Sequence, residues 1–315
     1  MNVLVTGADG QLGKCLIDVF NIFDKKDNCV FLNRELFDLT KKEQMLEQFE
    51  RFTPDVVINC AAYTDVEKSE ENEGYSAFLV NSDGVAELMS VCREYDSCLI
   101  HISTDYVFDG RKKTPYTECD KTHPLNQYGA TKIIGEKAVL DYKKGIVIRT
   151  SWLYSEYGKN FYKTMLGRIK EKRETNVVCD QIGTPTYAKD LAHFIVGLVY
   201  SEKCMKMSGI YNFSNCGLAS WYDFASAIET LYSKYGPYEP MRIDPIEIKF
   251  TPTVYEKRYI NPTTSEKYKT KAKRPFYSVL DKTKIRTELG VKPRHWIDAL
   301  SDCMKNDNKI WIGLK

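Results

Sequence analysis

The segment after the first apolar run constrains the fold of this chain most. Residues 6–13 read TGADGQLG, with glycines at 7, 10 and 13, between a strand-like run at 3–6 and helical spacing at 11–23. Glycines at this spacing permit a tight turn, close approach of the backbone to a pyrophosphate and close packing of the helix on the strand. The N-terminus of the following helix also offers free N–H groups to phosphate. The context therefore favours a dinucleotide-binding turn over a tight turn with incidental glycines.

Apolar runs and helical spacings alternate through the N-terminal half. Strands are expected at 3–6, 29–32, 55–59, 98–102 and 146–149, and helices at 11–23, 41–52, 78–93 and 126–140. Nearly all-apolar strands joined by helices are typical of a buried parallel sheet with helices on both faces. We therefore predict an α/β fold, a doubly wound parallel sheet (Rossmann) over residues 1–150, with 177–200 completing the sheet.

The regular alternation is lost after residue 150. Helical spacing returns near 189–200, 221–235 and 296–304, and a proline-rich stretch with little periodicity runs from 236 to 275. Ligands of open α/β sheets bind at the carboxyl edge of the strands. We therefore predict that 151–315 mainly forms a smaller C-terminal lobe that binds substrate over this edge.

Composition excludes several classes of function. The 315 residues carry 45 Lys and Arg against 43 Asp and Glu, a net charge of +2, which gives no basic field for nucleic acid or an anionic membrane. No apolar run approaches the roughly 20 residues that span a bilayer. The ten cysteines are scattered, with no Cys-x-x-Cys and no nearby His pair. We expect a cytoplasmic protein without a metal site.

The residues after the second expected strand bear on the choice of cofactor. An NAD site usually carries an acidic residue about 20 positions after the glycine turn. Here Asn33 and Arg34 occupy that place. Asn33 does not repel a 2′-phosphate and Arg34 can pair with one, although a solvated loop arginine is the alternative. The sequence favours NADPH, with NADH as the alternative.

A phenol and an amine stand one helical turn apart at Tyr128 and Lys132, in the run YGATK. A free phenol has a pKa of about 10, and a nearby cation lowers it toward neutral pH. Thr104 follows the expected strand at 98–102, at the sheet edge where a substrate carbonyl would lie. Tyr128 could then protonate a carbonyl oxygen that Thr104 also contacts. Taken alone, Tyr128 and Lys132 could be an ordinary surface pair, and Thr104 a turn residue.

Together these motifs resemble the extended short-chain dehydrogenase/reductases and, within them, the dTDP-4-dehydrorhamnose reductase family. The resemblance runs through nearly the whole chain. The matching stretches are TGADGQLG (6–13), NCAAYTDVEKSE (59–70), STDYVFDG (103–110), PLNQYGATKIIGE (124–136), IRTSWLY (148–154), DQIGTPTYAKDLA (180–192) and RPFYSVLD (274–281).

The resemblance implies a catalytic set of Thr104, Tyr128 and Lys132. With the residues of the glycine turn and Arg34, the expected cofactor contacts are Gly7, Gly10, Gln11, Leu12, Gly13, Arg34, Asp38, Leu39, Ala61, Ala62, Tyr63, Tyr128 and Lys132. The expected substrate contacts are Thr104, Tyr106, Trp152, Asn160, Gln181, Thr184 and Arg274. Core packing is the alternative for the two aromatic residues Tyr106 and Trp152, and a surface position for Arg274.

The family resemblance also implies the reaction. We expect NAD(P)H-dependent reduction of the C4 ketone of dTDP-4-dehydro-L-rhamnose to dTDP-L-rhamnose, a step toward surface polysaccharide, by a monomer or weak homodimer. A reductase or epimerase of another nucleotide 4-keto sugar is one alternative. A non-catalytic regulatory subunit of the methionine adenosyltransferase type is another, since fold does not settle function.

Two features depart from the family pattern. The segment 235–273 is longer than the usual linker. Cys15 stands where family members often carry a glutamate, which some of them use for a metal at a dimer interface. We therefore predict no metal.

Overall fold

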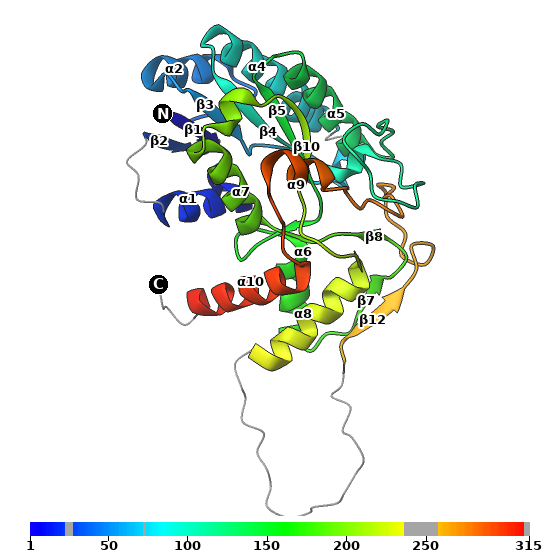
Figure 1. Ribbon diagram of the computed structural model, residues 1–315. Helices are drawn as coiled ribbons and strands as arrows, with labels where there is room; N and C mark the ends of the chain where they lie inside the picture. The colour runs from blue at the N-terminus through cyan, green and yellow to red at the C-terminus, as the bar shows by residue number, and fades with distance from the viewer. Residues whose placement is uncertain (23–27, 72–73, 236–257, 312–315) are drawn as a thin grey trace, which may run out of the picture.

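The computed structural model describes residues 1–22, 28–71, 74–235 and 258–311. Its centre is a six-stranded parallel sheet in the order β10-β5-β4-β3-β1-β2 (Figure 1). The strands are β1 (Val3–Thr6), β2 (Cys29–Leu32), β3 (Val56–Asn59), β4 (Cys98–Thr104), β5 (Gly145–Thr150) and β10 (Gly209–Asn212). The predicted α/β fold class is confirmed. The chain passes from β1 to β2 on one side and then to β3 on the other, so the switch point for ligand binding lies between β1 and β3.

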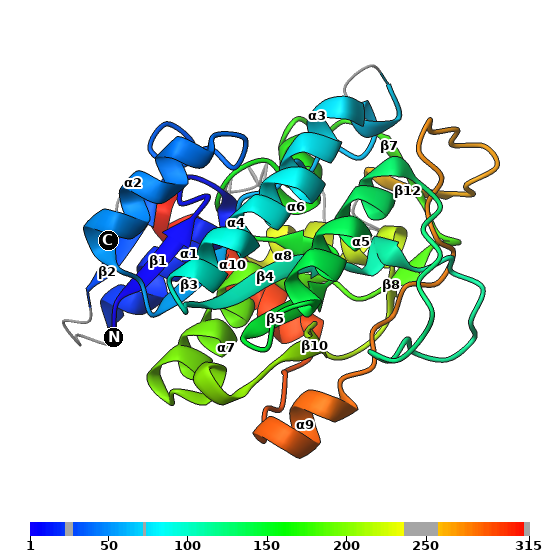
Figure 2. The same ribbon diagram turned by 90° about the horizontal axis from the view of Figure 1, so that it is seen from above.

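Helices cover both faces of this sheet (Figures 1 and 2). The helices α1 (Gln11–Ile22) and α7 (Ala188–Tyr200) pack together on one face. On the other lie α2 (Lys42–Phe52), α4 (Gly84–Glu94) and α5 (Gln127–Leu140). Successive strand residues point to opposite faces. Val3 and Val5 therefore join the core under α1 and α7, while Leu4 joins the core under α2 and α4.

One prediction about the sheet was wrong. Residues 177–200 were expected to complete it, but the sixth strand is β10, which pairs with β5. The strand β7 (Thr175–Val178) instead pairs with β12 (Ile260–Thr263), outside the sheet. Only α7 from that segment covers the sheet. Residues 188–213 thus return from the second lobe to the first.

A second lobe has its own core. It contains α6 (Phe161–Lys170), α8 (Trp221–Tyr235) and α10 (Trp296–Trp311), together with β7 and β12. Short strands pair nearby: β6 (Leu153–Tyr154) with β9 (Thr186–Tyr187), and β8 (Ile182–Gly183) with β11 (Ala219–Ser220). The helix α9 (Thr283–Leu289) lies against β10 instead.

One connection departs from regular helix close to the sheet edge. The helix α3 (Gly74–Phe78) continues through a π-helical turn (Leu79–Asp83) into α4. Such turns are frequent near functional sites. Separately, within the described ranges no helix combines the length and apolarity that crossing a bilayer requires. Most of the proline-rich stretch, from 236 to 257, lies outside the described residues.

Candidate active site

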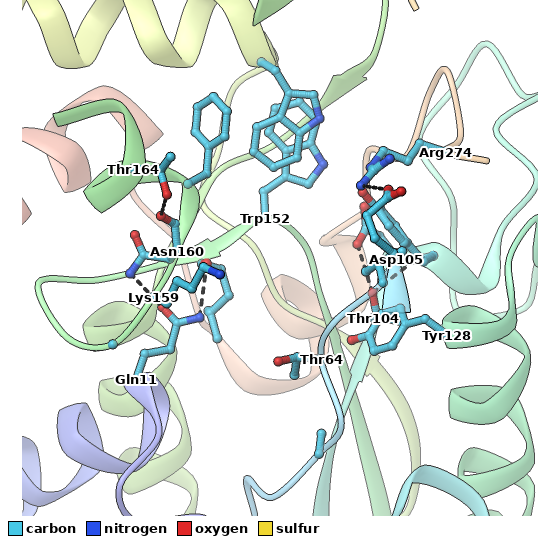
Figure 3. A pocket seen from close by; sticks show the side chains of 18 of the residues that line it. Gln11, Thr64, Thr104, Asp105, Tyr128, Trp152, Lys159, Asn160, Thr164 and Arg274 are labelled. Carbon is cyan, nitrogen blue, oxygen red and sulfur yellow. Dashed lines mark hydrogen bonds and ion pairs between the residues drawn. The ribbon is translucent and has the colours of Figure 1, made fainter. Parts of the chain in front are cut away.

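A cleft of about 1250 Å³ opens at the carboxyl edge of the sheet, between the sheet and the second lobe. Figure 3 shows Thr104, Asp105 and Tyr128 on one side of it, and Gln11 and Asn160 on the other. Thirteen of the residues that were expected to bind cofactor or substrate line this cleft: Gly10, Gln11, Leu12, Gly13, Ala62, Thr104, Tyr106, Tyr128, Lys132, Trp152, Asn160, Gln181 and Arg274. The expected residues outside its lining are Gly7, Arg34, Asp38, Leu39, Ala61, Tyr63 and Thr184.

The glycine turn has the shape that a pyrophosphate requires. Gly7 has a φ of 66°, and a Cβ there would lie 2.7 Å from the Ala61 nitrogen. A Cβ on Gly13 would lie 2.4 Å from the Gly7 carbonyl oxygen. Side chains are therefore excluded at both positions. Gln11, Leu12 and Gly13, in the first turn of α1, line the cleft, and the N–H groups of a first helical turn have no partner within the helix, so the turn fits a dinucleotide phosphate.

The loop after β2 forms its own polar contacts. The Arg34 side chain is 81% exposed, and its Nε lies 3.2 Å from Asp38 Oδ2. Asp38 also accepts hydrogen bonds from the Thr40 backbone N–H and hydroxyl. Leu39 is buried in the core beside α2 and α4. The loop lies near the turn, because the Ala8 N–H donates to the Leu32 carbonyl.

Side chains fix the backbone that follows β3. The Ala61 N–H donates to Asn59 Oδ1 (3.2 Å) and Thr6 Oγ1 (3.3 Å). The Tyr63 N–H donates to Asn81 Oδ1, and the Asn81 amide donates back to the Tyr63 carbonyl. Asn81 belongs to the π-helical turn, so this irregular turn supports the cleft wall.

Three predicted catalytic residues meet where β4 and α5 join. Thr104 ends β4, and α5 carries Tyr128 and Lys132 one turn apart. Asn126 caps α5 by accepting from the Gly129 N–H at 2.8 Å. A Cβ on Gly129 would lie 2.2 Å from the Tyr106 carbonyl oxygen, so only glycine lets α5 approach the end of β4 this closely. The packing brings the Tyr128 phenol into hydrogen bonding with Thr104.

The electrostatics of this pair differ from the sequence prediction. Burial raises the pKa of Tyr128 to about 12, and the hydrogen bond with Thr104 only partly opposes it. Lys132 was expected to lower that pKa. Its Nζ instead donates to the Ile102 carbonyl at 2.6 Å and lies 3.2 Å from His101 Nε2. Burial lowers the pKa of Lys132 to about 8.

Sequence reasoning missed Asp105, which also lines the cleft. This carboxyl is 2% exposed, and its Oδ2 has no hydrogen-bond partner among the described residues. Burial raises the pKa of Asp105 to about 7, although hydrogen bonds from Ser278 and Thr104 oppose the rise. Its position directly after Thr104 was the available signal. A buried carboxyl with a pKa near neutral, beside Thr104 and Tyr128, suits recognition of a polar ligand.

Aromatic rings form the wall of the cleft on the second lobe. The Trp152 and Trp221 rings stack with centroids 3.6 Å apart and planes 6° apart. Phe161 packs against Trp221 at 4.6 Å. Trp152 has a φ of 46°, in the left-handed region. A Cβ on Gly183 would lie 2.5 Å from the Trp152 ring, so glycine makes room for it. Sequence reasoning found Trp152 and missed its partner.

The weaker substrate candidates have different surroundings. Asn160 caps α6, and its amide donates to the carbonyls of Ser155 and Tyr157. Gln181 donates to Ser265 at 2.9 Å. Thr184 is buried and donates to the Gly217 carbonyl at 2.9 Å, away from the cleft lining.

Cations gather around the same cleft. Arg274 pairs with Glu67 at 2.6 Å and hydrogen-bonds the Tyr106 phenol. Other basic residues on the lining, which sequence reasoning missed, are Lys159, Arg168, Lys269 and Lys271. These residues come from distant parts of the chain, so no local sequence motif predicts that they meet at the cleft. Their charge suits an anionic ligand such as a diphosphate. Across the described residues, no cluster of His, Cys, Asp and Glu could hold a metal ion.

Residues 1–309 match the model of the RmlD substrate binding domain. A dTDP-4-dehydrorhamnose reductase of Aggregatibacter actinomycetemcomitans is 38% identical over 95% of this chain and 97% of its own length. The dTDP-4-keto-6-deoxy-D-glucose reductase of Streptomyces niveus is 37% identical over 95% and 94%.

A solved structure agrees with both. The dTDP-4-dehydrorhamnose reductase of Bacillus anthracis, in complex with NADP, superposes with a TM-score of 0.82 at 32% identity, over 96% of this chain and 98% of its own. The family model and the relatives each span nearly the full chain. The chain belongs to the RmlD substrate-binding-domain family.

Proposed function

We propose that this protein uses NADPH to reduce the C4 ketone of dTDP-4-dehydro-L-rhamnose, forming dTDP-L-rhamnose. NADH is the alternative cofactor. The observation that carries the proposal is the meeting of Thr104, Tyr128 and Lys132 in one cleft with the glycine turn. A cofactor whose pyrophosphate binds at the turn and a ketone held at the Tyr128 phenol would lie in the same cleft, as hydride transfer requires.

The cofactor fits the residues of the turn and would be held by it. The glycines at 7, 10 and 13 leave room for a pyrophosphate, and the first turn of α1 supplies N–H donors. Arg34 is exposed beside the turn and supports a preference for a 2′-phosphate. Bound NADPH supplies the hydride.

The chain's own residues supply the proton and the orientation. The Tyr128 phenol donates its proton to the carbonyl oxygen of the sugar, and Thr104, already bonded to the phenol, holds that oxygen. Lys132 lines the same cleft and would hold the ribose of the cofactor. A raised pKa keeps Tyr128 protonated at neutral pH, so the phenol enters the reaction as an acid.

The division of labour between the lobes is part of this proposal. We assign dinucleotide binding to 1–150 with the returning segment 188–213, and sugar-nucleotide binding mainly to the lobe formed by the rest of 151–315. Trp152, Trp221 and Phe161 offer apolar faces for the base and sugar. The cations at Arg168 and Lys269 suit the diphosphate.

A second keto sugar is supported by one relative. The Streptomyces niveus protein is named for dTDP-4-keto-6-deoxy-D-glucose, which differs from the rhamnose precursor in ring stereochemistry. A non-catalytic regulatory role is less well supported, because such a protein has no need to keep Thr104, Tyr128 and Lys132 together in the cleft.

A substrate panel tests the proposal. The purified protein is mixed with dTDP-, UDP- and GDP-linked 4-keto sugars and with NADPH or NADH, and loss of reduced cofactor is followed by absorbance. We expect the fastest consumption with dTDP-4-dehydro-L-rhamnose and NADPH. Faster turnover of another sugar would move the assignment to that sugar, and no turnover with any of them would favour the regulatory role.

A further inference from the structure

A chain of buried polar side chains runs beneath the cleft from the glycine turn to Lys132. The Thr6 hydroxyl donates to Asn59 Oδ1 at 2.7 Å, and Asn59 Nδ2 lies 3.1 Å from His101 Nδ1. On the far side of the imidazole, His101 Nε2 lies 3.2 Å from Lys132 Nζ. All four side chains are at most 1% exposed. Buried polar groups of this kind must satisfy one another, because water does not reach them.

Two donors favour one orientation of the Asn59 amide. The Thr6 hydroxyl donates to Asn59 Oδ1 at 2.7 Å, and the Ala61 backbone N–H, which is shared with Thr6 Oγ1 at 3.3 Å, lies 3.2 Å from the same oxygen. The amide nitrogen therefore faces His101. Since an amide nitrogen only donates, His101 Nδ1 accepts, and it carries no proton.

The tautomer of His101 follows from this. Burial lowers the pKa of His101 well below its ordinary value, so the ring is neutral. A neutral imidazole whose Nδ1 accepts carries its proton on Nε2. That N–H points at Lys132 Nζ. An ammonium there would set two donors against each other, whereas a neutral amine accepts from Nε2–H and still donates to the Ile102 carbonyl.

We propose that His101 is a positioning residue for Lys132: Asn59 fixes its imidazole as the Nε2–H tautomer, and this N–H holds Nζ in place and disfavours its protonated form. The inference deepens the proposed function, because Lys132 belongs to the proposed catalytic set.

The other titratable groups that face Lys132 act in the opposite direction. Glu136, one turn further along α5, favours the charged amine. Its carboxylate is shared with Arg149, through contacts of 2.9 and 2.7 Å, which weakens that effect. Cys60 follows β3, and burial raises the pKa of its thiol to about 12, so it is neutral. The phenol of Tyr128 is neutral as well. His101 is thus the neighbour whose N–H donor points at Nζ and disfavours the ammonium form of Lys132.

Magnetic resonance on the ligand-free protein tests the tautomer directly. The chain has four histidines, so the ring nitrogens of His101 can be assigned by a His101→Gln variant. We expect His101 to show the Nε2–H tautomer and to stay unprotonated at pH values where an ordinary histidine is already charged. An Nδ1–H tautomer would overturn the proposal, and this measurement needs no variant to be stable.

The second measurement is the titration of Lys132, followed on isotope-labelled lysine and assigned with Lys132→Arg. In His101→Gln an amide oxygen can replace the N–H opposite Nζ, so the midpoint should rise by about one pH unit or more. The control variant is His193→Gln, which replaces an exposed histidine of α7. It should leave the titration midpoint of Lys132 unchanged. An unchanged midpoint in a folded His101→Gln protein would overturn the proposal. The tautomer of His101 and the titration of Lys132 are both measured without turnover. They therefore test this proposal even if none of the keto sugars is reduced.

Discussion

Glu136 and Arg149 form a two-point ion pair beneath the cleft, with Arg149 Nη2 2.7 Å from Glu136 Oε2 and both side chains 3% exposed. The Ser103 hydroxyl donates to the same carboxylate at 2.5 Å, and the Phe108 ring packs against the guanidinium at 5.1 Å. Residues of β4, α5 and β5 are joined here. The cluster therefore supports the two elements that carry Thr104 and Tyr128.

Removing one charge of this pair should destabilise the fold strongly. In Glu136→Gln the buried guanidinium loses its counter-charge, and such losses cost about 3–5 kcal/mol. Denaturant unfolding measures the change. The control is Asp141→Asn, which breaks an exposed pair with Arg93 and should cost less than about 1 kcal/mol. Equal losses in the two variants would show that the buried pair does not hold β4, α5 and β5 together.

The phenol of Tyr128 should be needed for turnover and not for cofactor binding. Tyr128→Phe keeps the ring and removes the acid, so kcat should fall about 10²–10⁴-fold. The dissociation constant for NADPH, measured by fluorescence titration, should change little. Tyr95→Phe, at the end of α4 and outside the cleft lining, should keep the parent rate. A Tyr128→Phe protein that turns over normally would remove the phenol from the mechanism.

The stacked tryptophans should contribute to affinity for the nucleotide sugar. Replacing Trp221 by Ala removes one ring of the pair, and the loss of an aromatic face for a base is worth about 1–3 kcal/mol. The dissociation constant for dTDP should rise about tenfold, measured by calorimetry, while that for NADPH stays constant. Trp221→Phe should recover most of the affinity. If dTDP binds Trp221→Ala as tightly as the parent, the base lies elsewhere.

Much of this architecture could be predicted from sequence, because the information was local. The central strands are nearly all apolar, and Tyr128 and Lys132 are neighbours on one helix. The sixth strand was missed because the Val177–Val178 run is as apolar as β10 is. The pairing of β7 with β12 distinguishes this run from a strand of the central sheet. That pairing depends on residues more than 80 positions away in the sequence.

Other parts of the site have no local signal. Trp221 stacks on Trp152 from a separate helix, and Arg168 joins the cleft from α6. His101 lies within an apolar strand, where its role depends on Asn59 and Lys132 from neighbouring elements. The direction of the Tyr128 pKa was also mistaken, since burial depends on packing that the helix spacing does not reveal.

The buried carboxyl of Asp105 should make stability depend on pH. Burial raises the pKa of Asp105 from 3.8 to about 7 in the folded protein, so folding favours its protonated form. This contribution is fully present below the unfolded pKa and is lost as pH rises through the folded pKa. Between about pH 4 and pH 7 the parent should lose about 1–4 kcal/mol relative to Asp105→Asn. Parallel unfolding curves for the two proteins across this range would contradict the assignment.

The transfer of a labelled hydride tests the central claim most directly. The protein is incubated with dTDP-4-dehydro-L-rhamnose and NADPH that carries deuterium at the reactive position of the nicotinamide, and the product is analysed by mass spectrometry and magnetic resonance. The account predicts dTDP-L-rhamnose with one deuterium on C4, formed by the parent and lost in Tyr128→Phe. Recovery of unchanged keto sugar, or a product without deuterium at C4, would contradict it.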